Sequence, residues 1–214
     1  MKKTLCILLA LLMVFSFAAC GNSGKDQGNK PSEADEVKLT RGTWNEAQTE
    51  FVNESTGIKI TLPSGYAVMG DKELVDNYAA GSNIDFSTWT EESYKTEINI
   101  PDTAFVNYLT GANCAILYEN LKAEKASYLK EDQYLDIATE GVKKEFAGLE
   151  GSDYYDITLS GQNYRAIDMK YSTQGMNVSQ TMAVRKVGDD YITVMVFTAI
   201  NDNTEIQKME GFFN

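Results

Sequence analysis

The sequence contains no histidine among its 214 residues, and this absence excludes more function classes than any other feature of the composition. Without histidine the chain cannot build a Ser–His–Asp or Cys–His catalytic site, a histidine-based zinc site or an imidazole pH switch. Basic residues are also scarce, with 19 lysine and arginine against 31 aspartate and glutamate, and the formal net charge is −12. Because a nucleic-acid binder neutralises phosphates with clustered basic side chains, we expect no nucleic-acid partner.

Cysteine is also rare, and the chain has only Cys6, Cys20 and Cys114. Cys6 lies in an N-terminal apolar segment and Cys20 follows that segment directly, so only Cys114 belongs to the part expected to fold. We therefore predict no disulfide bond within the folded part. Cys114 lies in a run typical of a half-buried strand, and we interpret it as a small buried hydrophobic residue rather than a catalytic thiolate.

The N-terminus has the composition of an export signal. A short cationic start precedes residues 5–17, an apolar run in which Ser16 is the only clearly polar member. A helix of that length reaches about 20 Å, short of the roughly 30 Å hydrocarbon core of a bilayer. The run is therefore typical of a signal peptide rather than of a membrane-spanning helix.

The five residues at the end of this run, Phe17-Ala-Ala-Cys20-Gly21, resemble the bacterial lipobox. The lipobox more often has leucine where this sequence has Phe17. In that family the cysteine is diacylated and becomes the new N-terminus. The resemblance implies a signal peptide over residues 1–19 and a lipid anchor at Cys20, which would hold the protein at the extracytoplasmic face of the cell membrane. The alternative is an ordinary secretory signal cut before Cys20, with the cysteine incidental.

Residues 20–36 follow as a tether. Beyond the cysteine this segment has no aromatic and no branched apolar side chain, so it cannot bury enough surface to offset its ordering entropy. Residues 37–214 contain no second low-complexity stretch, no long linker rich in proline or glycine and no fixed-period repeat. We therefore predict a single domain over residues 37–214.

This domain has the sequence pattern of an α+β fold. Residues 50–62 and 104–118 each predict a hairpin, and residues 71–78 a short helix. Residues 131–148 predict the longest helix, because apolar side chains recur there every four residues. Residues 82–101 carry no clear pattern, and their first half is interpreted as a polar loop.

The C-terminal third predicts an antiparallel meander. Four segments with β propensity are joined by turns too short for any crossover, and the last strand is apolar enough to be buried on both faces. Asn203 is expected to cap a final amphipathic helix. The four segments are residues 155–160, 163–172, 177–187 and 191–200.

This order of elements resembles the Mog1/PsbP-like fold, and many Gram-positive lipoproteins are similar. The resemblance rests on the segment from Phe51 to Tyr66, on the helix that begins near Gln133-Tyr-Leu135, and on the strand and helix over residues 191–213. It implies an α/β/α sandwich with an antiparallel sheet and an accessory or binding role. It supplies no catalytic residue.

The candidate catalytic motifs are incomplete. Ser127-Tyr-Leu-Lys130 matches Ser-x-x-Lys, but the Ser-Asp-Asn and Lys-Thr-Gly elements of that enzyme family are missing. Asp189 and Asp190 are interpreted as turn residues. Glycine-rich nucleotide loops and EF-hand loops are also missing, so we predict no cofactor and no metal site. We expect no enzymatic activity, and a hydrolase that uses carboxylates or a Ser–Lys pair is the alternative.

Aromatic residues in predicted loops and strand edges supply the only hint of a ligand. Such side chains can stack on sugars or anchor peptides, or they can cap the core at the ends of the sheet. We predict a ligand-facing role for Trp89 first, and then for Trp44, Tyr154 and Tyr155. The predicted function is a membrane-anchored binding or accessory module for a protein or an envelope polymer. The receptor of an importer is an alternative, although such receptors are normally larger and built from βαβ units.

Overall fold

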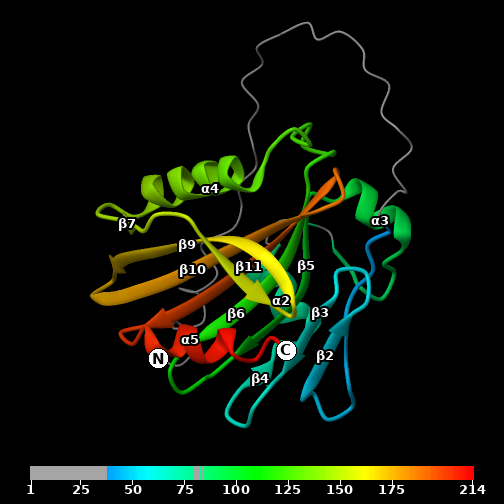
Figure 1. The fold of residues 1–214 in the computed structure, drawn as a ribbon. Coiled ribbons are helices and arrows are strands. Elements are labelled where there is room, and N and C mark those ends of the chain that lie inside the picture. The colour runs from blue at the N-terminus through cyan, green and yellow to red at the C-terminus, as the bar shows by residue number, and fades with distance from the viewer. Residues whose placement is uncertain (1–37, 80–81, 83) are drawn as a thin grey trace, which may run out of the picture.

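The computed structural model describes residues 38–79, 82 and 84–214 (Figure 1). The predicted signal peptide, the lipid-attachment residue Cys20 and the tether lie outside these residues. The elements in chain order are β1 (Thr43–Trp44), β2 (Glu50–Asn53), β3 (Ile58–Thr61), β4 (Ala67–Val68), α2 (Asp71–Tyr78), α3 (Glu91–Thr96), β5 (Asn99–Val106), β6 (Asn113–Asn120), α4 (Glu131–Glu145), β7 (Glu150–Gly151), β8 (Tyr155–Leu159), β9 (Gln162–Thr173), β10 (Met176–Val187), β11 (Tyr191–Ile200) and α5 (Thr204–Glu210).

An eight-stranded antiparallel sheet forms the centre of the described structure. Its order is β4-β5-β6-β11-β10-β9, and the short strands β7 and β8 both pair with β9 at the edge. Strands β8 to β11 are joined as neighbours in sequence, which confirms the predicted meander. Strand β11 lies between β6 and β10, and residues 191–199 are all buried, as expected for a strand covered on both faces.

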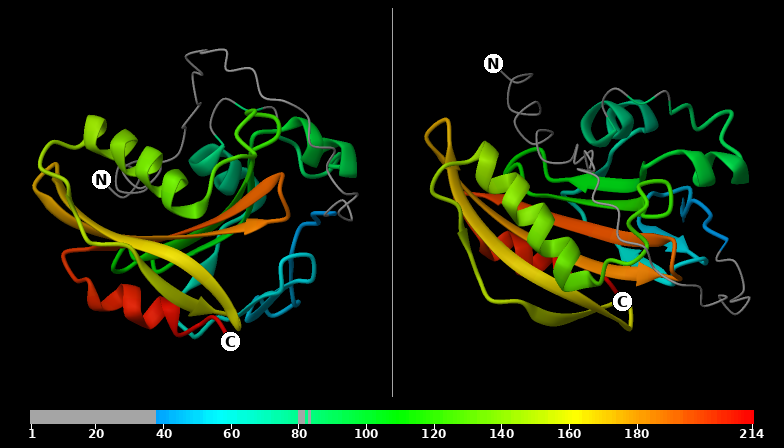
Figure 2. Two further views of the ribbon diagram at one scale, coloured as in Figure 1. Left: turned by 45° about the horizontal axis from the view of Figure 1, so that its top comes forward. Right: turned by 90° about the horizontal axis from the view of Figure 1, so that it is seen from above.

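Both faces of this sheet are covered, and β11 shows how the sequence serves both. Val194 and Val196 point to the face covered by α4 and α2, whereas Met195 and Phe197 point to the opposite face. The opposite face is covered by α5 and by a separate three-stranded sheet, β1-β2-β3 (Figure 2). The α+β class, with an antiparallel sheet packed between helices, is therefore confirmed. None of the described helices has the length and apolar character needed to span a bilayer.

Helix α4 confirms the longest predicted helix but ends earlier than residue 148. Its stripe buries Tyr134, Leu135, Ala138 and Val142 against the sheet. Phe146 lies just beyond the last turn, and its ring stacks on Tyr171 with the centroids 4.3 Å apart. The apolar repeat therefore extends past the helix, because Phe146 packs on the core from a non-helical position.

Two local predictions need correction. Asn203 makes no side-chain capping hydrogen bond at α5; instead Oδ1 of Asp202 accepts from the backbone N–H of Thr204 at 3.0 Å. The segment interpreted as a polar loop ends in helix α3. That helix is preceded by Thr90, whose backbone N–H donates to Oγ of Ser93 at 3.1 Å.

Candidate functional site

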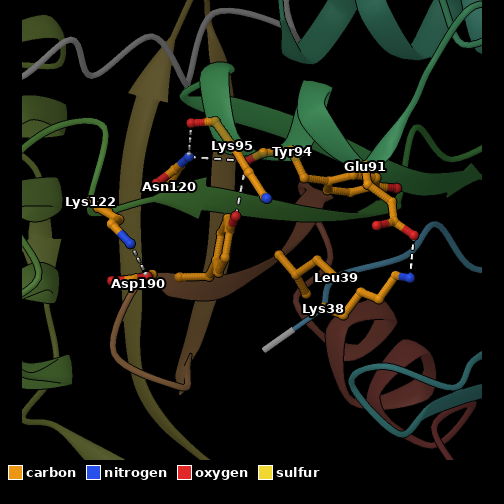
Figure 3. A pocket seen from close by; sticks show the side chains of 9 residues that line it. Lys38, Leu39, Glu91, Tyr94, Lys95, Asn120, Lys122 and Asp190 are labelled. Carbon is orange, nitrogen blue, oxygen red and sulfur yellow. Dashed lines mark hydrogen bonds and ion pairs between the residues drawn. The ribbon is translucent and has the colours of Figure 1, made fainter. Parts of the chain in front are cut away.

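A pocket of about 270 Å³ opens where α3, the end of β6, the β10–β11 turn and the segment before β1 meet (Figure 3). Its inner wall, which we call the floor, is buried, and its outer edge, the rim, carries charged side chains in contact with solvent. We call it the α3 pocket. The side chains that line it are Lys38, Leu39, Glu91, Tyr94, Lys95, Asn120, Lys122, Asp190 and Tyr191.

The floor of the α3 pocket fastens the C-terminal end of α3 to the sheet. Nδ2 of Asn120 donates to the backbone carbonyls of Tyr94 and Lys95 at 3.0 and 3.1 Å, and Oη of Tyr191 donates to the carbonyl of Tyr94 at 3.1 Å. The last carbonyls of a helix lack partners within the helix, so these bonds satisfy them. A six-residue helix thereby becomes a fixed wall of the pocket.

An aromatic cluster lies against this floor. The ring of Tyr94 contacts that of Trp89 edge to face at 5.4 Å, and Trp89 contacts Phe86 at 5.4 Å. The guanidinium of Arg41 lies 3.8 Å from the centroid of the Phe86 ring. Burial, with a smaller contribution from the charge of Asp102, raises the pKa of Tyr94 to about 12, so its hydroxyl is protonated at neutral pH.

The rim of the α3 pocket is formed by lysines in salt bridges. Lys38 pairs with Glu91 on one side of the opening, and Nζ of Lys122 lies 3.0 Å from Asp190 on the other (Figure 3). Lys95 lies between these two salt bridges in Figure 3. Its Nζ is 3.9 Å from a carboxylate oxygen of Glu92, which lies outside the pocket lining.

These salt bridges are exposed, and exposed pairs typically contribute only about 0–1 kcal/mol. The side chains of Lys38, Lys95 and Lys122 have exposed fractions of 64%, 52% and 69%. An incoming anion can therefore replace a carboxylate partner at little cost and gain charge-assisted hydrogen bonds. The lining holds three lysines against two carboxylates, although the whole chain has a net charge of −12.

The four aromatic residues predicted to face a ligand do not meet in one place. Trp89 is half-buried against the floor of the α3 pocket, whereas Nε1 of Trp44 donates to Oγ1 of Thr103 at 2.8 Å. The hydroxyl of Tyr154 bonds to Asp136 of α4, and that of Tyr155 donates to Asp168 at 2.9 Å on the other side of the sheet. A direct contact between any of the four and a ligand stays a prediction.

Among the residues of the candidate catalytic motifs, Asp190 lines the α3 pocket, and the others lie outside its lining. The carbonyl of Ser127 accepts from Nζ of Lys186 at 2.8 Å, and the backbone N–H of Lys130 donates to Gln133 at 3.0 Å. Asp189 and Asp190 lie on the turn between β10 and β11, as predicted. Cys114 is fully buried, and burial raises its thiol pKa well above the usual value.

The lysines of the rim were not among the residues singled out in the sequence. Lys38, Lys95 and Lys122 come from three separate segments, and no local spacing joins them. The fold alone brings them together, because β6 ends beside α3 while the chain before β1 passes the same place. A sequence signal for this site would have to come from pairs of positions far apart in the chain.

No protein-family model and no curated protein matches the chain. Among solved structures it is similar to LpqN of Mycobacterium tuberculosis, a protein involved in cell envelope biogenesis, with 15% identity and a TM-score of 0.39 over 72% of this chain and 76% of that one. It is also similar to cyanobacterial PsbP from Synechocystis, with 8% identity and a TM-score of 0.41 over 87% and 97% of the two chains.

A third similar structure is PA94 of Pseudomonas aeruginosa, a protein of unknown function described as a putative regulator. It shares 13% identity over 46% of this chain and 65% of that one, with a TM-score of 0.31. The PsbP structure belongs to the fold family that the sequence resembles.

Proposed function

We propose that this chain is a lipid-anchored extracytoplasmic binding module, whose α3 pocket holds an anionic group of an envelope polymer. The observation that carries the proposal is the ring of three lysines above a buried, hydrogen-bonded floor, on a chain that is acidic overall. Carboxylate and phosphate groups are the ligands that such lysines bind. The proposal assigns the site a binding role and no turnover.

The size of the pocket favours one unit of a larger molecule over a captured solute. Pockets that enclose small molecules typically span about 300–1,000 Å³, and the α3 pocket has about 270 Å³. Its rim is exposed, so a polymer can continue across the surface on either side of the bound group. This geometry supports a binding module rather than the receptor of an importer.

The membrane part of the proposal rests on Cys20 and on the charge of the domain. An acidic domain is repelled by anionic lipid, so lipid chains at Cys20 rather than the protein surface would hold it at the membrane. A tether of the length of residues 21–36 has a root-mean-square span of roughly 20–24 Å, which places the domain within reach of polymer near the membrane.

Phenyl phosphate is a suitable probe of the pocket, because it joins an anion to a ring that can pack on the floor. We expect the double variant Lys95→Ala/Lys122→Ala to bind it at least tenfold more weakly than the unmodified domain, since two charge-assisted bonds are lost. Isothermal titration calorimetry of residues 37–214 measures the dissociation constants. Phenol, which lacks the anion, should bind neither protein measurably.

The matched control is Lys143→Ala/Lys144→Ala at the end of α4, where Lys143 also forms an exposed salt bridge, with Glu140. This variant removes the same charge at a distance from the pocket and should bind phenyl phosphate as the unmodified domain does. Equal weakening in both double variants would mean that only the overall field attracts the anion, and the pocket assignment would be wrong.

The anchor is tested separately in cells. Cys20→Ala should leave the precursor unprocessed and unlabelled by a fatty-acid analogue, whereas two acyl chains should keep the unmodified protein in the membrane fraction through a salt wash. Equal labelling of the two proteins would contradict lipidation at Cys20.

A further inference from the structure

A second cleft, of about 440 Å³, lies between α5 and strands β8, β9 and β10, on the sheet face opposite α4. Its chemistry is the reverse of that of the α3 pocket, because carboxylates and amides dominate its lining. We call it the α5 cleft. The side chains and backbone that line it are Tyr155, Asp168, Met169, Lys170, Ser179, Gln180, Thr181, Asn203, Ile206, Gln207 and Glu210.

Asp168 is fixed in the cleft by two donors that reach the same oxygen. Oη of Tyr155 donates to Oδ1 of Asp168 at 2.9 Å, and Oγ1 of Thr181 donates to that oxygen at 2.6 Å. Both neighbours are rigid strand positions, so the carboxylate is held in one orientation. Its second oxygen, Oδ2, accepts no hydrogen bond from the residues that the structure describes, and it is therefore available to a ligand.

Glu210 faces the same cleft from the last position of α5, and none of the described lysine and arginine side chains pairs with it. Its carboxylate forms no hydrogen bond and no salt bridge within the described part of the chain, although it is half-buried. Burial raises its pKa, and the negative charge of Asp168 raises it further. A half-buried carboxylate beside a second carboxylate is unfavourable unless a cation joins them.

We propose that the α5 cleft binds an alkylammonium group, such as the side chain of a lysine on a partner, between Glu210 and Asp168. The ammonium has three donors, and the two carboxylates with the amide oxygens of the cleft supply acceptors for them. Ile206 and the ring of Tyr155 offer an apolar wall for the alkyl stem, and a ring face also attracts a cation.

A metal ion fits this cleft less well than an alkylammonium group does. Only two carboxylates line the cleft, and in the described ranges no group of three or more histidine, cysteine, aspartate or glutamate side chains is arranged to hold a metal ion. Lys170 also lines the cleft, but it is exposed, and within the described residues it forms no salt bridge with Asp168 or Glu210. The acidic character of the whole chain also favours the approach of basic partners.

The probe is Nα-acetyl-lysine methylamide, and its Nε-acetylated form serves as the neutral counterpart. We expect the cationic probe to shift the backbone amide NMR signals of Thr181 and Gln207, and the neutral probe to leave them in place. Glu210→Gln should weaken binding at least fivefold without lowering the melting temperature, because it removes an unpaired charge. The control Glu145→Gln, at the exposed end of α4, makes the same change of charge and should bind as the unmodified domain does.

Three results would overturn the proposal. A shift of the same signals by the neutral probe, with a similar dissociation constant, would show that charge is irrelevant. Glu145→Gln weakening binding as much as Glu210→Gln would show a general field effect. Displacement of the amine by equimolar calcium would identify the cleft as a metal site. The α3 pocket and its phosphate probe are independent of all three results.

Discussion

Asp102 of β5 and Glu119 of β6 lie on paired strands and are almost fully buried, with exposed fractions of 2% and 3%. They serve opposite faces of the sheet. Asp102 contacts the segments of the three-stranded sheet, and Glu119 lies under α4, where the hydroxyl of Tyr134 donates to it. Two buried carboxylates of the same charge thus experience different surroundings.

The surroundings of Asp102 are polar, and both of its carboxylate oxygens accept hydrogen bonds. Its Oδ1 accepts from the backbone N–H of Gly42 at 2.8 Å, and its Oδ2 accepts from Asn53 at 2.9 Å and from Tyr118 at 2.7 Å. Burial raises the pKa of Asp102, and these three hydrogen bonds limit the rise. The carboxylate therefore joins the segment around β1 and β2 to the eight-stranded sheet.

The surroundings of Glu119 are mostly apolar. Burial raises its pKa to about 7, the negative charge of Glu124 adds to the rise, and the bond from Tyr134 only partly opposes it. The α4 face is therefore held by apolar packing and tolerates a carboxylate poorly. The face under the three-stranded sheet uses a carboxylate as a link.

The largest effect should come from placing a second carboxylate on the α4 face. Val194→Asp puts one in the centre of β11, at a fully buried position with none of the donors that surround Asp102. The cost of several kcal/mol is comparable to the whole stability of a domain, so we expect insoluble or unfolded protein. Val52→Asp, at a 36% exposed position of β2, is the control and should fold. A soluble Val194→Asp variant with a cooperative urea transition would show that α4 does not seal this face.

Removing Asp102 should have the next largest effect. Asp102→Ala removes the acceptor of the Gly42 backbone N–H and the charged acceptor that Asn53 and Tyr118 share, although Asn53 keeps the carbonyl of Thr40 as an acceptor. We expect the free energy of unfolding to fall by about 3 kcal/mol. Urea denaturation measures this change. Asp102→Asn keeps an acceptor oxygen and should lose clearly less. Equal stability of Asp102→Ala and the unmodified domain would mean that this carboxylate contributes nothing to joining the two sheets.

The apolar packing of α4 on the sheet can be predicted from the sequence, whereas the hydrogen bonds of Asp102 cannot. The four-residue repeat of α4 and the apolar run of β11 identified the elements that pack together, because periodicity reports which face is buried. Asp102 gives no such signal, since its partners lie up to 60 residues away. The same limit applies to Trp44, which looks like a loop aromatic until Thr103 binds its indole N–H.

Helix α3 and the pocket beside it show why the site itself escaped prediction. The helix has six residues and buries only Tyr94, so no repeat can develop along it. Its C-terminal end is held by Asn120 and Tyr191, which lie 26 and 97 residues from Tyr94 in the chain. Residues that depend on such tertiary contacts carry no local pattern.

The contribution of Glu119 to the stability of the domain depends on pH. A carboxyl with a pKa of 4.5 when unfolded and about 7 when folded binds its proton more tightly in the folded state. Its contribution to stability is therefore greatest below about pH 4.5 and is lost as the pH rises to about 7. Glu119→Gln removes this dependence and should stabilise the domain by about 3 kcal/mol at pH 8, with little change at pH 4.5.

Urea denaturation at both pH values tests this prediction, with Glu145→Gln as the exposed control. The control should follow the unmodified domain at each pH. A Glu119→Gln variant that is less stable at pH 8 would show that the bond from Tyr134 outweighs the cost of burying the charge, and that Glu119 resembles Asp102 after all.

The smallest effect should come from a polar link on the α4 face that is exposed rather than buried. Nε of Arg165 on β9 lies 2.6 Å from Asp132 of α4, and its NH1 lies 3.1 Å from Asp156 of β8, so it joins three elements much as Asp102 does. The side chains of Asp132 and Asp156 have exposed fractions of 53% and 78%, so water and salt screen both salt bridges. Arg165→Met keeps the apolar stem and should lower the melting temperature by no more than about 2 °C, a difference that shrinks further in 0.5 M salt. Differential scanning calorimetry of this variant beside Asp102→Ala measures both links in one experiment. A loss at Arg165 as large as that at Asp102 would show that connectivity, and not burial, decides what a polar link contributes in this fold.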